Sequence, residues 1–211
     1  MTKELHYFNM NALGESIRYI LHYTKQKFAD IRHDVTTWPD QEIKDALPFG
    51  QLPIYKEDDR TLNQSLAIAK YAARGTDLIP KDPWEQAVVE SFVYTIYDYW
   101  LNARAYLREK DPKKKEEMRK KLLEETIDYF FSKFDKHLKE NGGFFIGRLT
   151  WAEFILCGIV ESTDLLLGVD LGKKYPKVAA VVEMIRNLPG VKEHIATRGP
   201  YSPPKINTAV F

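Results

Sequence analysis

Two different spacings of apolar residues divide about the first seventy-five residues of the chain into short elements. The segment from Ser16 to Lys25 has apolar residues at helical spacing, whereas the segment from Phe28 to Val35 alternates apolar and polar positions with the period of a strand. The pattern predicts these elements in chain order: a strand at 5–8, a helix at 16–25, a strand at 28–35, a weak helix at 38–46, short strands at 54–55 and 61–62, and a helix from Ser65.

The order of these elements, β-α-β followed by α-β-β-α, predicts an α/β domain with a thioredoxin-like arrangement. The stretch from Gly75 to Pro83 then contains turn-forming residues, and beyond Trp84 nearly every segment as far as Ile195 has helical period. We therefore expect a thioredoxin-like domain over residues 1–76, a linker over 77–83 and an all-α domain over 84–211. Residues 198–211 hold three prolines and no periodicity, which predicts an extended tail.

Charge and cysteine content exclude several classes of function. The 31 basic and 30 acidic residues give a formal net charge of +1, so there is no field to attract nucleic acid or an anionic membrane. No apolar run approaches the roughly 20 residues that span a bilayer. Met1 to Glu4 leads into a strand without an apolar signal segment, so a cytoplasmic protein is expected. The single cysteine, Cys157, excludes an internal disulfide, and the histidines lack the spacing of metal ligands, so no metal is expected.

The stretch from Phe49 to Ser65 combines features that suit a small, extended, anionic peptide. Pro53 opens a strand and so leaves the backbone of Leu52 free to pair with a ligand instead of a neighbouring strand. Ser65 stands at the N-cap position of the next helix, whose unpaired N–H groups and positive dipole end favour an anion. An ordinary helix cap is the alternative interpretation of Gln64 and Ser65.

Tyr7, at the end of the first predicted strand, is the candidate for catalysis. Thioredoxin-like redox enzymes place a cysteine just after this strand, and this chain has a phenol at the strand's end instead. A phenol O–H directed at a sulfur stabilises the thiolate by hydrogen bonding and lowers the pKa of the thiol. Trp38 and Lys44 offer an indole N–H and an ammonium to a second carboxylate. A packing or surface role is the alternative for each of these residues.

The segment from Thr150 to Glu153 has the sequence of a capping box, which predicts the start of a buried helix. Cys157 lies in the apolar part of this helix, so a buried structural thiol is expected. A functional role for either feature is disfavoured.

A set of motifs along the chain is similar to those of one known family. They are Tyr7-Phe8-Asn9-Met10, Trp38-Pro39, Leu47-Pro48-Phe49-Gly50-Gln51-Leu52-Pro53-Ile54, Gln64-Ser65-Leu66-Ala67-Ile68-Ala69 and Leu149-Thr150-Trp151-Ala152-Glu153. By these motifs the chain resembles the cytosolic glutathione transferases, most closely the sigma class, which includes the glutathione-dependent haematopoietic prostaglandin D synthases. The likeness extends to about Pro200.

The resemblance implies a role for each matched residue in binding glutathione as the co-substrate. Tyr7 would stabilise the glutathione thiolate, and a cis Pro53 would let the backbone of Leu52 pair with the cysteinyl part. Gln64 and Ser65 would bind the γ-glutamyl carboxylate. The residues around the glycyl end would be Trp38, Lys44 and Gln51. Asp98 would reach the γ-glutamyl ammonium across the interface of a homodimer.

The chain also departs from the prostaglandin synthases of this class. They carry an arginine in the position of Leu13 and a pocket tryptophan in the position of Ala105. Tyr94 and Tyr97 replace two of the three aspartates that give some of them a metal-responsive interface. Glu153 stands where aspartate is usual, and the tail after Pro200 is long and ends in apolar residues that would fold over the substrate pocket.

The resemblance implies a homodimeric enzyme that conjugates the glutathione thiolate to hydrophobic electrophiles, or reduces peroxides, in detoxification. The electrophile would lie in a cleft between the domains lined by Met10, Leu13, Tyr99, Arg104 and Tyr106. Two alternatives stay open at this point. One is glutathione-dependent isomerisation of prostaglandin H2 to its D form, and the other is a non-enzymatic carrier of haem or lipophilic ligands.

Overall fold

A mixed sheet forms the centre of the N-terminal part of the computed structural model, which describes residues 2–35, 37–38 and 40–198. Its strands are β1 (Lys3–Phe8), β2 (Ala29–His33), β3 (Ile54–Glu57) and β4 (Arg60–Asn63), in the spatial order β2-β1-β3-β4. β1 pairs with β2 in parallel and with β3 in an antiparallel ladder, and β3 and β4 form a hairpin. The predicted thioredoxin-like order is confirmed.

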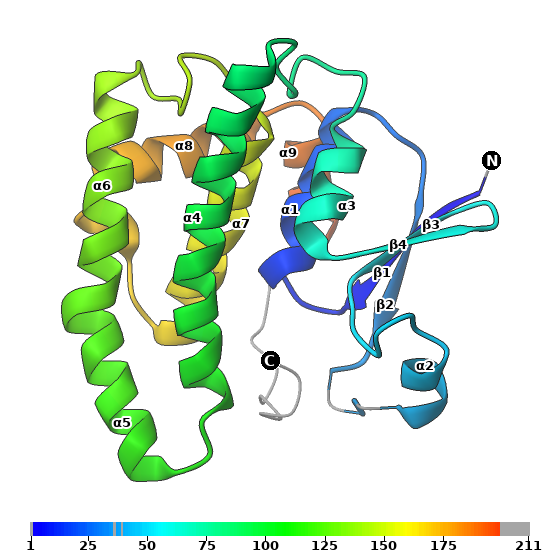
Figure 1. The fold of residues 1–211 in the computed structure, drawn as a ribbon, viewed down its shortest axis with the longest axis horizontal. Helices are drawn as coiled ribbons and strands as arrows, with labels where there is room; N and C mark the ends of the chain where they lie inside the picture. The colour runs from blue at the N-terminus through cyan, green and yellow to red at the C-terminus, as the bar shows by residue number, and fades with distance from the viewer. Residues whose placement is uncertain (1, 36, 39, 199–211) are drawn as a thin grey trace.

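Helices α1 (Ala12–Tyr23) and α3 (Ser65–Ala72) pack against each other beside the sheet, and the short α2 (Gln41–Asp45) lies apart from them (Figure 1). α1 begins earlier than the apolar spacing predicted, because the turn after β1 leads directly into it. α2 begins after Asp40, whose side chain caps it, so Trp38 precedes the helix instead of lying on it.

The prediction that Ser65 caps α3 is wrong by one position. Ser65 is the first helical residue, and Gln64 occupies the cap position with a positive φ of 72°. No side chain accepts a hydrogen bond from this end of the helix among the described residues. The first amides of α3 therefore remain available to a ligand.

Helices joined by loops make up the rest of the described chain, and they stand beside the sheet domain (Figure 1). Their bounds are α4 (Pro83–Arg108), α5 (Pro112–Lys121), a π-helical turn η1 (Leu122–Thr126), α6 (Ile127–Glu140), α7 (Trp151–Leu167), a short 3-10 turn η2 (Leu171–Lys173), α8 (Pro176–Asn187) and α9 (Val191–Arg198). The predicted α/β domain followed by an all-α domain is confirmed, and α4 borders the sheet domain. The extended tail predicted for 198–211, except Arg198 itself, lies outside the described residues.

α7 is the buried centre of the helical domain and packs against α1, α4 and α8. Its first turn holds the predicted capping box: the Thr150 hydroxyl accepts from the amide of Ala152 at 3.3 Å, and the Glu153 carboxylate accepts from the amide of Thr150 at 2.8 Å. Cys157 is buried on this helix, as expected of a structural thiol. Among the described residues no helix is both long and apolar enough to cross a membrane.

Candidate functional site

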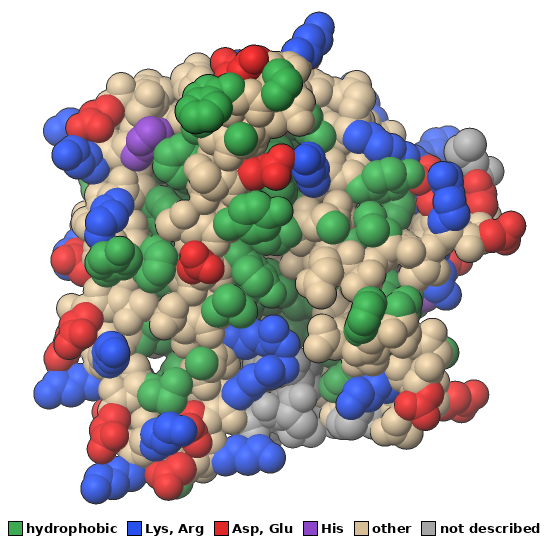
Figure 2. Space-filling view, in the orientation of Figure 1, with side chains coloured by type: hydrophobic (Ala, Val, Ile, Leu, Met, Phe, Trp, Pro, Cys, Tyr) green, Lys and Arg blue, Asp and Glu red, His purple; other side chains and the backbone are tan. Residues whose placement is uncertain are grey.

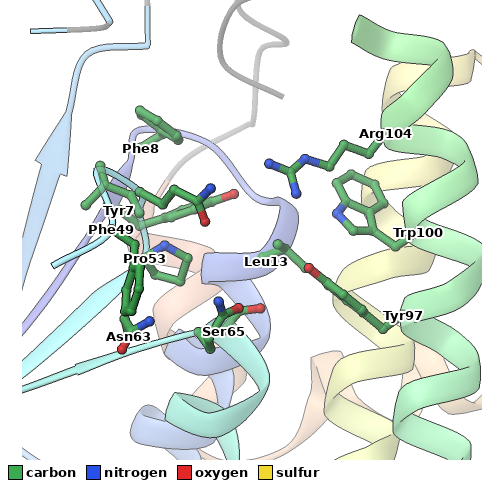
Figure 3. A pocket seen from close by; sticks show the side chains of 13 residues that line it. Tyr7, Phe8, Leu13, Phe49, Pro53, Asn63, Ser65, Tyr97, Trp100 and Arg104 are labelled. Atoms are coloured by element: carbon green, nitrogen blue, oxygen red, sulfur yellow. The ribbon is translucent and has the colours of Figure 1, made fainter. Parts of the chain in front are cut away.

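A cleft separates the sheet domain from α4, and both sides contribute side chains to it. The sheet side supplies residues from the end of β1, the start of α1, the loop before β3 and the start of α3, whereas α4 supplies Tyr97, Trp100 and Arg104 (Figure 3). The sheet-side residues that line it are Tyr7, Phe8, Leu13, Phe49, Gln51, Leu52, Pro53, Asn63, Gln64 and Ser65. The contiguous part of the cleft toward α2 is lined by Trp38, Lys44, Gly50, Arg104 and Arg108 as well.

Tyr7 lies at the base of this cleft, with 5% of its surface exposed. The backbone N–H of Leu13, in the first turn of α1, donates a hydrogen bond to the phenol oxygen. Burial raises the pKa of Tyr7 to about 12, against the opposing charges of Arg18 and Arg104. The phenol is therefore protonated at neutral pH, and its O–H is a donor to an atom placed in the cleft.

Gly14 sets how closely α1 can approach the phenol ring. A methyl group added at this glycine would lie 2.2 Å from Cδ1 of Tyr7 and 2.6 Å from Cγ. Only glycine therefore lets the first turn of α1 lie against the ring and bring the amide of Leu13 to the hydroxyl. Sequence analysis did not identify this residue.

A buried ion cluster fixes the turn that joins β1 to α1. Arg18 donates from Nε to both carboxylate oxygens of Asp30 at 3.0 Å, and from Nη1 to the carbonyl of Met10 at 2.9 Å and to Glu15 at 3.1 Å. Its guanidinium also lies 5.9 Å from the centre of the Tyr7 ring. His194 of α9 bonds to Glu15 at 2.9 Å, so the last described helix is tied to the same cluster.

The loop before β3 presents backbone groups to the cleft. The bond between Leu52 and Pro53 is cis, and β3 begins at Ile54, so Leu52 lies beyond the end of the β1–β3 ladder. Gln64 and Ser65 lie opposite it at the start of α3, where the helix dipole is positive. The predicted edge and helix start therefore face one space, as an extended anionic ligand requires.

The part of the cleft toward α2 is strongly basic. Trp38 packs edge-on against Phe8, with ring centres 5.2 Å apart, and lines this space together with Lys44 and Gln51. Arg104 and Arg108 reach it from α4. The structure thus brings together the three residues that sequence analysis assigned to one carboxylate.

Several residues expected to line the substrate part of the cleft lie elsewhere. Met10 is buried in the core, and Tyr99 is buried in the helical domain, where its hydroxyl bonds to Thr163 at 3.1 Å and its ring packs on Phe131. Tyr106 is half-buried, with Lys115 of α5 5.4 Å from its ring. Because an α-helix turns by about 100° per residue, Tyr99 and Tyr106 lie on the face of α4 opposite to Arg104. Those three placements were wrong, and Leu13 and Arg104 do line the cleft.

Asp98 is exposed on α4 and is not among the described residues that line the cleft of its own chain. It differs in this from the other residues expected to bind glutathione, which line the cleft. No group of histidine, cysteine, aspartate or glutamate among the residues described here is arranged to hold a metal ion.

Comparison with known proteins assigns the chain to a family. A family model for the N-terminal domain of glutathione S-transferase matches residues 3–74, and one for its C-terminal domain matches residues 97–198. The chain belongs to the glutathione S-transferase family. It is 32% identical over 196 residues to a glutathione S-transferase of Anopheles gambiae, which covers 92% of this chain and 96% of that protein.

Other relatives of this transferase are prostaglandin synthases. The chain is 34% identical over 195 residues to the hematopoietic prostaglandin D synthase of Homo sapiens, across 92% of this chain and 96% of that protein. The solved structure of prostaglandin synthase D of Nilaparvata lugens superposes with a TM-score of 0.89 at 32% identity, over 96% of this chain and 100% of that one. The family assigned from the motifs is thus confirmed.

Sequence analysis missed part of the cleft of this transferase. Phe49 lies in a motif that was recognised and Asn63 directly precedes another, but their side chains were given no role. Tyr97, Trp100 and Arg108 share the face of α4 that carries Arg104, since residues three, four, seven and eight apart lie on one side of a helix. Helical spacing from Arg104 was the signal that could have found them.

Proposed function

We propose that this protein is a glutathione transferase in which Tyr7 holds the sulfur of glutathione as a thiolate. The observation that supports this proposal is the buried phenol of Tyr7, which lies against the first turn of α1 and lines the same cleft as Leu52 and the first turn of α3. The thiolate attacks a hydrophobic electrophile that lies toward α4. Free thiols have a pKa of about 8.5, so a shift of about two units, or about 2.7 kcal/mol, makes the thiolate the major form at neutral pH.

The tripeptide is proposed to lie along the sheet side of the cleft. Its cysteinyl backbone pairs with Leu52 next to Pro53, and its γ-glutamyl carboxylate is bound by Gln64 and Ser65 at the dipole of α3. The basic part of the cleft takes the glycyl carboxylate through Trp38, Lys44 and Gln51. Each negative end of the ligand then meets donors or positive charge.

We propose that the protein is a homodimer of the sigma type, because the described residues that line the site of one chain include no acid for the γ-glutamyl ammonium. Asp98 of a second copy supplies it. Phe49 and Tyr94 are large apolar residues with 72% and 55% of their surface exposed, as expected of an interface between copies. A cytoplasmic role in detoxification follows from the proposed reaction. The domain limits 1–76, 77–83 and 84–211 are proposed with it.

The substitution Tyr7→Phe tests the mechanism. It removes the hydroxyl and keeps the ring, so turnover with 1-chloro-2,4-dinitrobenzene should fall about tenfold to a hundredfold while the KM for glutathione changes little. The pKa of the bound thiol, read from thiolate absorbance, should rise by one to two units. One pKa unit corresponds to about 1.4 kcal/mol, which is also the free energy of a tenfold change in rate. An unchanged rate would remove Tyr7 from the mechanism. A wild-type protein that is not retained on immobilised glutathione would refute the whole proposal.

Isomerisation of prostaglandin H2 by the same thiolate is the second candidate. Relatives named hematopoietic prostaglandin D synthase, at 34% identity for the human protein, favour it. Leu13 and Ala105 weigh against it, because they replace the arginine and the tryptophan of the synthases. Conversion of prostaglandin H2 by the purified protein in the presence of glutathione decides between the two reactions.

A carrier of haem or lipophilic ligands is the third candidate. The proposed glutathione-binding residues all line the cleft in one chain except Asp98, and a carrier has no need of them. Tight haem binding together with negligible conjugation would favour this function over the transferase.

A further inference from the structure

The side of the cleft formed by α4 carries a row of hydrogen-bond donors. Trp100, Arg104 and Arg108 are spaced four residues apart, so they form one ridge along the helix, about 12 Å long. Figure 3 shows the guanidinium of Arg104 extending from α4 toward Tyr7, with Trp100 beside it. Figure 2 shows basic side chains gathered at the lower end of this face, below hydrophobic ones.

The indole N–H of Trp100 has no hydrogen-bond partner among the described residues, although only 2% of the side chain is exposed. Trp100 lines the cleft, and in Figure 3 the nitrogen is on the side of the ring that faces it. A buried donor without an acceptor costs free energy, and such donors are uncommon in folded proteins. An acceptor atom of a ligand would remove this cost.

Arg104 and Arg108 form no ion pair with any carboxylate of the described chain, although both border the cleft. They are like charges one helical turn apart, which repel each other. Partial burial and the charge of Arg104 lower the pKa of Arg108. An anion placed between the two guanidinium groups would relieve both the repulsion and the loss of solvation.

In the proposed function the carboxylates of glutathione have donors on the sheet side at Ser65 and Lys44, so the row on α4 is left for a second ligand even though Arg104 and Arg108 border the same basic part of the cleft as Lys44. The row belongs instead to the helix that borders the space left for the second substrate. Leu13 and the ring of Tyr97 supply apolar surface beside Trp100 and Arg104, whereas Arg108 borders the adjoining part of the cleft together with Arg104. The second substrate therefore meets an apolar wall next to the sulfur and a basic ridge farther along α4.

We propose that Arg104, Arg108 and Trp100 form a subsite for the carboxylate of an amphipathic electrophile. The inference rests on the proposed transferase function and names its substrate class: an apolar, electron-poor alkene that carries a carboxylate. In such a substrate the alkene is conjugated to a ketone and forms an enone. The thiolate sulfur bonds to the β-carbon of the enone, the electron pair of the double bond moves to the ketone oxygen, and a proton from water completes the adduct. Arg104 and Arg108 hold the carboxylate, and Trp100 donates to one of its oxygens.

The test compares ethacrynic acid with its methyl ester, which share the enone and differ in charge. The wild-type protein should have a kcat/KM for the acid at least about tenfold above that for the ester, because a charge-assisted pair of hydrogen bonds is worth this much. In the variant Arg104→Met/Arg108→Met the ratio of kcat/KM for the acid to kcat/KM for the ester should fall about tenfold or more, mainly because the KM for the acid rises. Arg104→Lys/Arg108→Lys should restore part of the ratio.

Two further variants separate this subsite from general effects of charge. Lys120→Met removes an exposed cation from α5 and should leave the ratio as in the wild type. Trp100→Phe removes the N–H and keeps an aromatic ring, so it should lower the ratio by a smaller factor than the arginine changes. Salt should raise the KM for the acid and not for the ester, because it screens the interaction of charges.

An acid-to-ester ratio that does not change in the arginine variant would overturn the proposal. So would a raised KM for glutathione with an unchanged ratio, because the arginines would then serve the tripeptide. Conjugation of the uncharged 1-chloro-2,4-dinitrobenzene distinguishes failure of the transferase function from failure of the subsite. A wild-type protein that does not conjugate this compound refutes the transferase function. A wild-type protein that conjugates it but does not prefer the acid to the ester refutes only the carboxylate subsite.

Discussion

Replacing Gly14 by alanine should displace the phenol of Tyr7, the proposed catalytic group, without changing any polar group. The added methyl would lie 2.2, 2.6 and 2.9 Å from three ring carbons of Tyr7. Carbon atoms pack at about 3.5–4.0 Å, so the ring and the first turn of α1 must separate by roughly 1 Å or more. The phenol oxygen would then move away from the amide of Leu13 and from the proposed position of the sulfur.

The expected losses of stability and of activity differ in size. Overpacking costs about 1–3 kcal/mol, and the higher helix propensity of alanine returns up to about 1 kcal/mol, so the free energy of unfolding should fall by roughly 0–3 kcal/mol. A displacement of about 1 Å can lower turnover about a hundredfold. Since the hydroxyl is the group that is misplaced, turnover should fall about tenfold to a hundredfold and no further than in Tyr7→Phe.

The assay is steady-state conjugation of 1-chloro-2,4-dinitrobenzene, with urea unfolding measured in parallel. Gly158→Ala is the matched control, because its methyl would crowd Ser16 of α1 at 2.2 Å without touching Tyr7. This control should lower stability and change turnover less. The double variant Gly14→Ala/Tyr7→Phe should be no slower than Tyr7→Phe alone, since both changes remove the same interaction, that of the Tyr7 hydroxyl. Turnover of Gly14→Ala within about twofold of the wild type would refute the proposed link between this contact and catalysis.

The remaining predictions concern buried ionisable groups. Burial by itself raises the pKa of Glu15, but the hydrogen bond from His194 and the charge of Arg18 outweigh it and lower the pKa to about 2. The ionised carboxylate therefore stabilises the fold above its ordinary pKa of 4.5, and this contribution is lost as the pH falls through about 2. From about pH 5 to 2, urea unfolding should show the wild type losing up to about 3 kcal/mol more than Glu15→Gln, and parallel curves would contradict this. Burial raises the pKa of the Cys157 thiol, so a disulfide reagent should label one thiol per chain only in denaturant, and rapid labelling of the native protein would contradict its burial.

Local sequence signals were sufficient for the elements that depend on neighbouring residues. The capping box at Thr150 needs only residues within one turn, and the strand end at Tyr7 and the α3 start at Gln64 lie in continuous motifs. That Leu52 and the start of α3 would border one space could therefore be predicted, because the donors there come from backbone groups whose positions follow from the type of element. The family motifs supported the same residues.

The side chains that complete the cleft depended on how distant elements pack. Arg18 meets Asp30 of β2 and Glu15, and His194 joins them from α9, so no local pattern indicated this cluster. On α4, the helical period was enough to predict the helix but not its orientation. Tyr99 contacts Thr163 of α7 and Phe131 of α6, so that face of α4 points into the helical domain, and Trp100 and Arg104 line the cleft.

The sequence by itself thus determined the order of strands and helices, the phenol at the end of β1 and the family. The tertiary structure alone decided which face of α4 borders the cleft, how closely Gly14 lets α1 approach Tyr7, and which cations remain without a carboxylate partner among the described residues. The physical reason is the range of the interactions. Hydrogen bonds within an element and turn geometry act over a few neighbouring residues, whereas packing and charge pairing act between residues that only the fold brings together.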